Sequence, residues 1–119
     1  MVSDASDLKP SYNPSNVAKF GPAVIEKRTD NSSLRELGTS FMEFTETGAS
    51  DPWTLRYEET IYVIAGHLEL QVLGTDPELT VVGQVGDLLV LPEGTSVRYC
   101  AEKGTRLLLS ITPANWRNR

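Results

Sequence analysis

The stretch from residue 53 to residue 66, WTLRYEETIYVIAG, constrains the fold of this chain more than any other segment. Successive side chains of a β-strand point to opposite faces, so a strand with one buried face shows a period of two. Here the odd positions are apolar or aromatic with one exception, and most even positions are polar. The odd set is Trp53, Leu55, Tyr57, Glu59, Ile61, Val63 and Ala65. Its β-branched and aromatic residues favour a strand over a helix.

The exception is Glu59, which places a carboxyl group on the otherwise apolar face. If that face lines a barrel interior, Glu59 is either buried at a free-energy cost or directed into an internal cavity. Desolvation would raise the pKa of its carboxyl group unless a hydrogen-bond donor or a cation stabilises the ionised form. The sequence therefore marks Glu59 as the residue whose chemistry has to be explained.

The rest of the chain contains further short strand patterns, separated by glycine, proline and polar turn residues. We expect strands at residues 17–20, 22–28, 41–45, 67–73, 79–82, 88–91, 95–101 and 105–112, and one helical turn at 33–37. Residues 88–91 are apolar at both parities, which indicates burial from both sides or an interface. Many short strands at regular spacing predict an all-β sandwich, barrel or jelly roll.

The length and composition limit the domain organisation and the partners. A chain of 119 residues has room for one domain, which we expect at residues 17–119, after a polar N-terminal arm at residues 1–16. The formal charge of −5 and the scattered basic residues argue against a nucleic-acid partner. No apolar run reaches the ~20 residues that span a bilayer, so we expect no membrane partner. No signal peptide is visible and Cys100 is the single cysteine, so we expect a cytoplasmic protein.

Two spaced motifs resemble those of the cupin proteins. Glu59 followed by Gly66 is similar to the end of the first cupin motif, and residues 86–94, GDLLVLPEG, are similar to the start of the second. Their glycines and proline would turn the chain sharply between strands. The resemblance implies a cupin-type double-stranded β-helix, the RmlC-like jelly-roll barrel. It also implies a homodimer formed through the apolar sheet surface that residues 88–91 and residues 17–25 would leave uncovered.

The resemblance also identifies the positions of the usual cupin metal ligands. The two histidines of the first motif fall at Trp53 and Leu55, and the histidine of the second motif falls at Val97. Imidazole and carboxylate groups bind transition metals through lone pairs that these three side chains lack. Only Glu59 remains of the four ligands, so we expect no metal and no cofactor. An unusual site built from Glu59, tyrosine hydroxyls and water is the alternative.

Further residues are similar to the cupin domain of the EutQ family of ethanolamine-utilisation proteins. The similarity covers roughly residues 38–116, and its specific parts are PWTLRYEE at 52–59 and PANW at 113–116. The resemblance implies a role in ethanolamine utilisation, and acetate kinase activity has been attributed to the family. The sequence contains no glycine-rich phosphate loop of the Gly-x4-Gly-Lys kind. Kinase activity is therefore an expectation of the resemblance alone.

For function we expect a pocket in the barrel mouth that binds a small polar metabolite. Its predicted walls are Trp53, Leu55, Val97 and Tyr99. Glu59 would act as a catalytic acid or base, and Tyr57 as its hydrogen-bonding partner. Two alternatives stay open: Glu59 is a structural carboxyl group bonded to a tyrosine, or the chain is a non-catalytic binding or regulatory module. The only histidine, His67, has outward parity and is expected at the surface.

Overall fold

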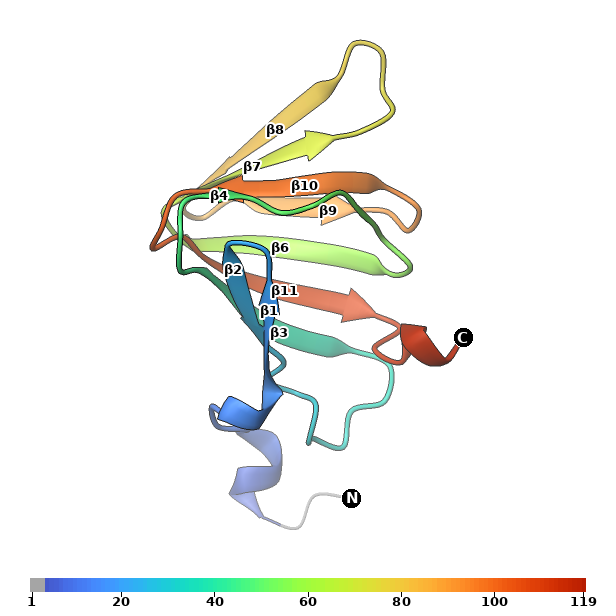
Figure 1. The fold of residues 1–119 in the computed structure, drawn as a ribbon. Coiled ribbons are helices and arrows are strands. Elements are labelled where there is room, and N and C mark those ends of the chain that lie inside the picture. Colours follow the sequence, from blue (N-terminus) through green and yellow to red (C-terminus); the bar gives the residue numbers. More distant parts are fainter. Residues whose placement is uncertain (1–3) are drawn as a thin grey trace.

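The computed structural model describes residues 4–119 as two antiparallel β-sheets that pack against each other (Figure 1). The larger sheet has the strand order β1-β2-β3-β11-β6-β9, and the smaller sheet has the order β4-β10-β7-β8, with β5 paired to β10. The strands are β1 Val17–Phe20, β2 Ala23–Glu26, β3 Gly38–Phe44, β4 Gly48–Ala49, β5 Trp53–Thr54, β6 Glu58–Ala65, β7 His67–Val72, β8 Leu79–Gln84, β9 Leu88–Leu91, β10 Ser96–Ala101 and β11 Arg106–Thr112. The all-β prediction is confirmed.

The alternation of residues 53–66 decides which side chains enter the core. Ile61 and Val63 of β6 are fully buried, whereas every even position from 54 to 64 is exposed. β6 pairs with β11 so that Leu109 lies opposite Ile61 and Leu107 opposite Val63. The two strands therefore present one apolar surface to the smaller sheet. The buried apolar set is Ala23, Met42, Phe44, Leu55, Tyr57, Ile61, Val63, Leu68, Leu70, Leu91, Val97, Tyr99, Leu107, Leu109 and Trp116.

The prediction of one continuous strand over residues 53–65 is wrong, because the strand is split into β5 and β6. Between these two strands, the backbone of Leu55 forms hydrogen bonds with a neighbouring turn. The amide of Leu55 donates to the carbonyl of Thr95 at 2.9 Å, and the amide of Gly94 donates to the carbonyl of Leu55 at 2.8 Å. The inward parity survives the break, since Leu55 and Tyr57 are both buried.

The expected helical turn at residues 33–37 is also wrong. The amide of Leu34 binds the hydroxyl of Ser32 at 3.2 Å, and the carbonyl of Glu36 accepts from the amide of Ala114 at 2.8 Å. One isolated turn of helix is unfavourable, so these local and tertiary bonds prevail. Among residues 4–119 the only helices are the short 3-10 helices η1 Ala5–Leu8, η2 Pro14–Asn16 and η3 Trp116–Asn118.

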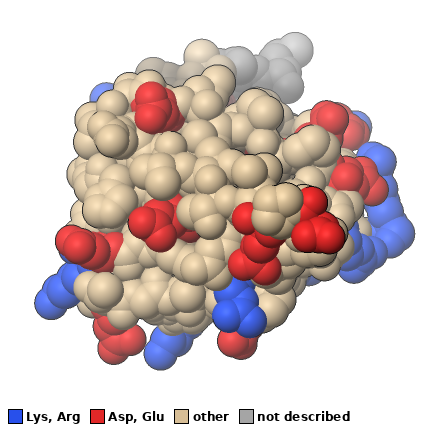
Figure 2. Space-filling view, turned by 90° about the horizontal axis from the view of Figure 1, so that it is seen from above, with Lys and Arg blue, Asp and Glu red and all other residues tan. Residues whose placement is uncertain are grey.

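The segment before β1 runs away from the two sheets (Figure 1). It contains η1 and η2, and residues 1–3 of the expected arm lie outside the described part of the chain. No helix within residues 4–119 is long and apolar enough to cross a membrane. Figure 2 shows the face on the side of β8, where acidic side chains lie at several places, some of them grouped toward the right, and the Lys and Arg side chains lie mostly toward the edges. No basic stripe crosses this face.

The outer surface of β9 is apolar and open. Leu88 is 61% exposed and Val90 is 66% exposed, whereas Leu91 is buried. The prediction that residues 88–91 are buried from both sides is therefore wrong for the single chain. The other alternative, an interface, stays a prediction.

Candidate functional site

A cavity of about 240 Å³ is lined by residues from both sheets and from the C-terminal segment. Its lining residues are Phe20, Ile25, Lys27, Ser40, Met42, Trp53, Tyr57, Glu59, Tyr99, Leu109, Ile111, Ala114, Trp116 and Arg117. Apolar and aromatic side chains dominate this set, and a few polar groups stand among them. That composition is typical of a small-molecule site.

Glu59 is the acidic group of this cavity. It lies on β6 with only 4% of the residue exposed, and its Oε1 accepts a hydrogen bond from the Tyr99 hydroxyl at 2.7 Å. Tyr99 comes from β10 in the opposite sheet, so this bond joins the two sheets across the cavity. Oε2 makes no hydrogen bond within residues 4–119, where no buried side-chain nitrogen or oxygen lacks a partner. Oε2 is therefore not sealed from solvent, and it is free to form a further hydrogen bond.

Burial determines the protonation states of Glu59 and Tyr99 near neutral pH. Desolvation raises the pKa of Glu59 to about 7, and the hydrogen bond from Tyr99 opposes that rise. No cation of residues 4–119 forms an ion pair with Glu59. Burial, and then the charge of Glu59, raises the pKa of Tyr99 well above its ordinary value. Near neutral pH, Glu59 can thus give or take a proton while Tyr99 remains a neutral donor.

An aromatic wall stands beside Glu59. The indole Nε1 of Trp53 donates to the hydroxyl oxygen of Tyr57 at 2.9 Å, and the ring of Trp116 lies 5.8 Å from Trp53 and 5.3 Å from Tyr57. Burial, followed by the charge of Glu59, raises the pKa of Tyr57 to about 12. The Tyr57 hydroxyl accepts from Trp53 and donates to no described residue. Its proton is therefore available to a ligand.

The structure brings four of the predicted site residues together and leaves two out. Glu59, Tyr57, Trp53 and Tyr99 line the same cavity. Leu55 and Val97 do not line it; they are 1% and 0% exposed and pack in the core between the sheets. The expectation that these two residues wall the pocket is corrected accordingly: small apolar side chains on the inward face fill the core. His67 is exposed, as its parity predicts.

Several lining residues were not predicted from the sequence. Phe20, Lys27, Ser40, Trp116 and Arg117 come from segments whose patterns show no chemistry. Trp116 alone carried a signal, because a tryptophan in an otherwise polar tail has to find a buried surface. It is 8% exposed and packs against the aromatic wall. The two cationic residues of the cavity, Lys27 and Arg117, belong to none of the sequence motifs.

The residues present do not fit the usual histidine-ligated cupin metal. Trp53, Leu55 and Val97 stand at three of its four ligand positions, and none carries a lone pair for a transition metal. Within residues 4–119, no group of three or more His, Cys, Asp or Glu residues could hold a metal ion.

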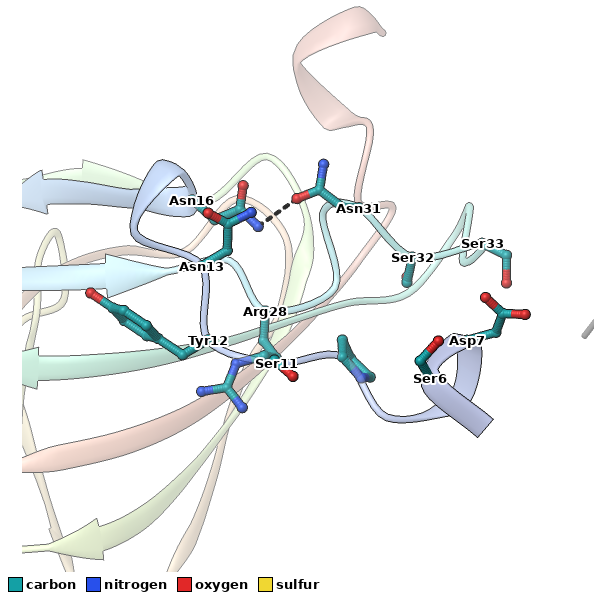
Figure 3. A pocket seen from close by; sticks show the side chains of 11 residues that line it. Ser6, Asp7, Ser11, Tyr12, Asn13, Asn16, Arg28, Asn31, Ser32 and Ser33 are labelled. Carbon is teal, nitrogen blue, oxygen red and sulfur yellow. Dashed lines mark hydrogen bonds between the residues drawn. The ribbon is translucent and has the colours of Figure 1, made fainter. Parts of the chain in front are cut away.

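A second hollow, of about 430 Å³, lies between the N-terminal segment and residues 28–33 (Figure 3). Its side chains are mostly Ser and Asn, and the amide of Asn16 donates to Asn31 at 2.8 Å across one end. Its cation, Arg28, is held by both carboxyl oxygens of Glu26, at 3.0 and 2.8 Å. None of the residues that line this hollow is buried, and its arginine is already paired with a carboxylate, so the smaller cavity at Glu59 is the candidate site.

Comparison with known proteins agrees with this architecture. The family model described as "Ethanolamine utilisation protein EutQ" matches residues 13–118. A Salmonella typhimurium relative named "Acetate kinase EutQ" is 32% identical over 89 residues, which are 75% of this chain and 35% of the relative. The structure of the Clostridium difficile EutQ protein is 27% identical with a TM-score of 0.69, covering 95% of this chain and 93% of that one.

A RmlC-like cupin from Shewanella frigidimarina shares the fold at 17% identity, with a TM-score of 0.70 over 93% of this chain and 96% of that one. The fold is therefore that of a RmlC-like cupin, as the two sequence motifs predict. The chain spans about a third of the length of the Salmonella relative. It belongs to the EutQ family of ethanolamine-utilisation proteins.

Proposed function

We propose that the cavity binds a small polar metabolite and that Glu59 transfers a proton to or from it. The observation that carries this proposal is the second carboxyl oxygen of Glu59. It has no hydrogen-bond partner within residues 4–119, it belongs to a residue that lines the cavity, and burial raises the pKa of this carboxyl group to about 7. A carboxyl group that titrates near the working pH is suited to general acid–base catalysis.

The neighbouring residues have separate roles in this proposal. Tyr99 holds Glu59 in place through its hydrogen bond, and Tyr57 offers its hydroxyl proton to an oxygen of the ligand. Trp53 and Trp116 supply an apolar wall that keeps the carboxyl group desolvated. The cavity of about 240 Å³ is smaller than the ~300–1,000 Å³ of sites for drug-sized ligands. A metabolite of a few carbon atoms is therefore the expected ligand.

Acetate and ethanolamine belong among the first compounds to test, because the relatives and the family carry these names. Acetate kinase activity itself would need a site for a nucleoside triphosphate. The sequence has no Gly-x4-Gly-Lys phosphate loop, and the chain spans only part of the relatives that bear the name. The activity that we propose is proton transfer at Glu59, which rests on the cavity and on the hydrogen bonding of this carboxyl group.

A melting experiment with a panel of short hydroxy acids, keto acids, amino alcohols and acetate tests the proposal. A ligand at one hundred times its Kd stabilises the folded state by about 2.7 kcal/mol, which raises Tm by several degrees. We expect this shift in the wild type and in Glu69→Gln, whose exposed side chain lies on β7 outside the cavity. In Glu59→Gln the shift should be lost.

Two other outcomes would replace this proposal. If no compound shifts the melt and Glu59→Leu is more stable than the wild type, the cavity is a filled core and the chain is a non-catalytic module. If elemental analysis of untagged protein finds stoichiometric metal that Glu59→Gln lacks, an unusual site of Glu59, tyrosine and water is present.

We also propose that the chain forms a homodimer through the outer face of β6 and β9. Leu88 and Val90 are exposed there, and Tyr62 of β6 lies opposite Leu88 with 43% exposure. A contiguous apolar face of this kind is costly to leave in water. Analytical ultracentrifugation should give twice the chain mass for the wild type and the single chain mass for Val90→Glu. A monomeric wild type would contradict the dimer.

A further inference from the structure

We infer that the ligand of this cavity is a small anion, with its charged group bound by Lys27 and Arg117 and a hydroxyl or carbonyl oxygen directed at Glu59. This inference rests on the proposed function and names the chemical class of its ligand.

The charges that line the cavity are the first observation. Among its described lining residues, the groups that carry charge are Lys27, Arg117 and Glu59. No carboxylate of residues 4–119 forms an ion pair with Lys27 or Arg117. The chain has 16 acidic and 11 basic residues, so carboxylates are plentiful elsewhere. While Glu59 is protonated, two cations without an ion-pair partner can attract an anion to the cavity.

Arg117 is held at the cavity by an aromatic ring. Its guanidinium carbon lies 4.3 Å from the centre of the Trp116 ring, which is part of the cavity wall. Burial raises the pKa of Tyr57, and the charge of Arg117 opposes that rise, so this charge acts on the interior of the site. A guanidinium group presents a planar set of donors that matches a carboxylate or a phosphate.

Lys27 enters the cavity from the end of β2. Its backbone amide donates to the carbonyl of Asn16 at 3.0 Å, which fixes the start of a half-buried side chain. An ammonium group on a flexible stem can follow an anion that Arg117 has already bound. A cation that follows β2 and a cation of the C-terminal segment thus border a single cavity.

Glu59 provides the second half of the recognition. An ionised Glu59 would repel an anion, whereas a protonated Glu59 can donate a hydrogen bond to an oxygen of the ligand. The free Tyr57 hydroxyl proton can serve the same oxygen. The site therefore suits a molecule with an anionic group at one end and a hydroxyl or carbonyl group at the other.

Calorimetric titration with two matched pairs of probes tests this inference. The pairs are 3-hydroxybutyrate with 3-hydroxybutyramide, and glycerol 3-phosphate with glycerol. We expect at least one anion to bind, with its neutral partner roughly tenfold weaker or worse, since hydrogen bonds to charged groups are worth about 1.5–3 kcal/mol. The pair that responds tells a carboxylate ligand from a phosphate ligand.

The variants assign the effect to the two cations. The double variant Lys27→Gln/Arg117→Gln should bind the anion roughly tenfold more weakly. The control Lys19→Gln/Arg98→Gln removes the same charge from exposed positions and should bind within about twofold of the wild type. Melting curves of both double variants establish that they are folded.

Three results would overturn the inference: neither anion binds, the neutral probes bind as tightly, or the Lys27/Arg117 variant keeps the wild-type affinity. The proposed function fails separately, if Glu59→Gln binds every probe as the wild type does. A ligand that needs Glu59 but ignores the two cations would thus leave the proposed function intact.

Discussion

As the pH rises from 4.5 to 7, the ionisation of Glu59 alone is expected to lower the free energy of unfolding by about 3 kcal/mol. Burial raises the pKa of this carboxyl group from 4.5 to about 7 in the folded protein. A group whose folded pKa lies above its unfolded pKa binds more protons in the folded state. Its contribution is fully present below the unfolded pKa of 4.5 and is lost as the pH rises through the folded pKa of about 7.

Urea unfolding of the wild type and of Glu59→Gln across this pH range measures the effect. Other carboxyl groups titrate in both proteins, so the difference between the two profiles isolates Glu59. The wild type should lose about 3 kcal/mol relative to the variant as the pH rises to 7. Glu69→Gln, at an exposed position, should follow the wild type. Parallel profiles for the wild type and Glu59→Gln would show that Glu59 is not desolvated.

Gly66→Ala is expected to destabilise the fold by roughly 3 kcal/mol or more. Gly66 joins β6 to β7 with φ +74°, a conformation that L side chains rarely adopt. A Cβ at this position would collide with the hydroxyl oxygen of Thr105 and would lie 2.9 Å from its Cα. The hydroxyl could rotate away, but the Cα cannot. The backbone of Thr105 is also bound to β3, because its carbonyl accepts from the amide of Phe44 at 2.9 Å.

Gly74→Ala is the matched control for this substitution. Gly74 has φ +83°, and no atom lies within 4 Å of the position of its added Cβ. The control therefore carries only the conformational cost of about 1–2 kcal/mol. Chemical denaturation of both variants gives the comparison. Equal losses would mean that the contact with Thr105 relaxes freely and that Gly66 is needed only for its backbone conformation.

The sequence predicts the parts of this molecule that follow from alternation. The odd positions of residues 53–65 turn inward, which places Tyr57 and Glu59 on the buried side even though the strand breaks between β5 and β6. Tyr99 shares this parity through Val97, and it proves to be the residue that binds Glu59. The parity of a strand is fixed by the pleat of the backbone, so it survives a local break.

The parts that could not be predicted depend on tertiary contacts. Lys27 and Arg117 lie just outside regular strands, and no period places them at the cavity. Leu55 and Val97 share the inward parity of Glu59, yet they belong to the core and not to the cavity wall. Parity tells which side of a sheet a residue faces, but the packing of the opposite sheet decides whether that side is filled. The interruption of the predicted strand at residues 55–57 also depends on a tertiary contact, since the turn at Gly94 forms a hydrogen bond with the backbone of Leu55.

The central claim is that Glu59 is a desolvated carboxyl group that exchanges a proton near neutral pH inside an open cavity. Carbon-13 NMR of protein labelled at the glutamate side-chain carboxyl carbon measures this directly, and the resonance missing from Glu59→Gln assigns the signal. We predict a titration midpoint near pH 7 for Glu59 in the free protein. A midpoint near the ordinary glutamate value of about 4.3 would contradict the claim, because it would mean a solvated or ion-paired carboxylate.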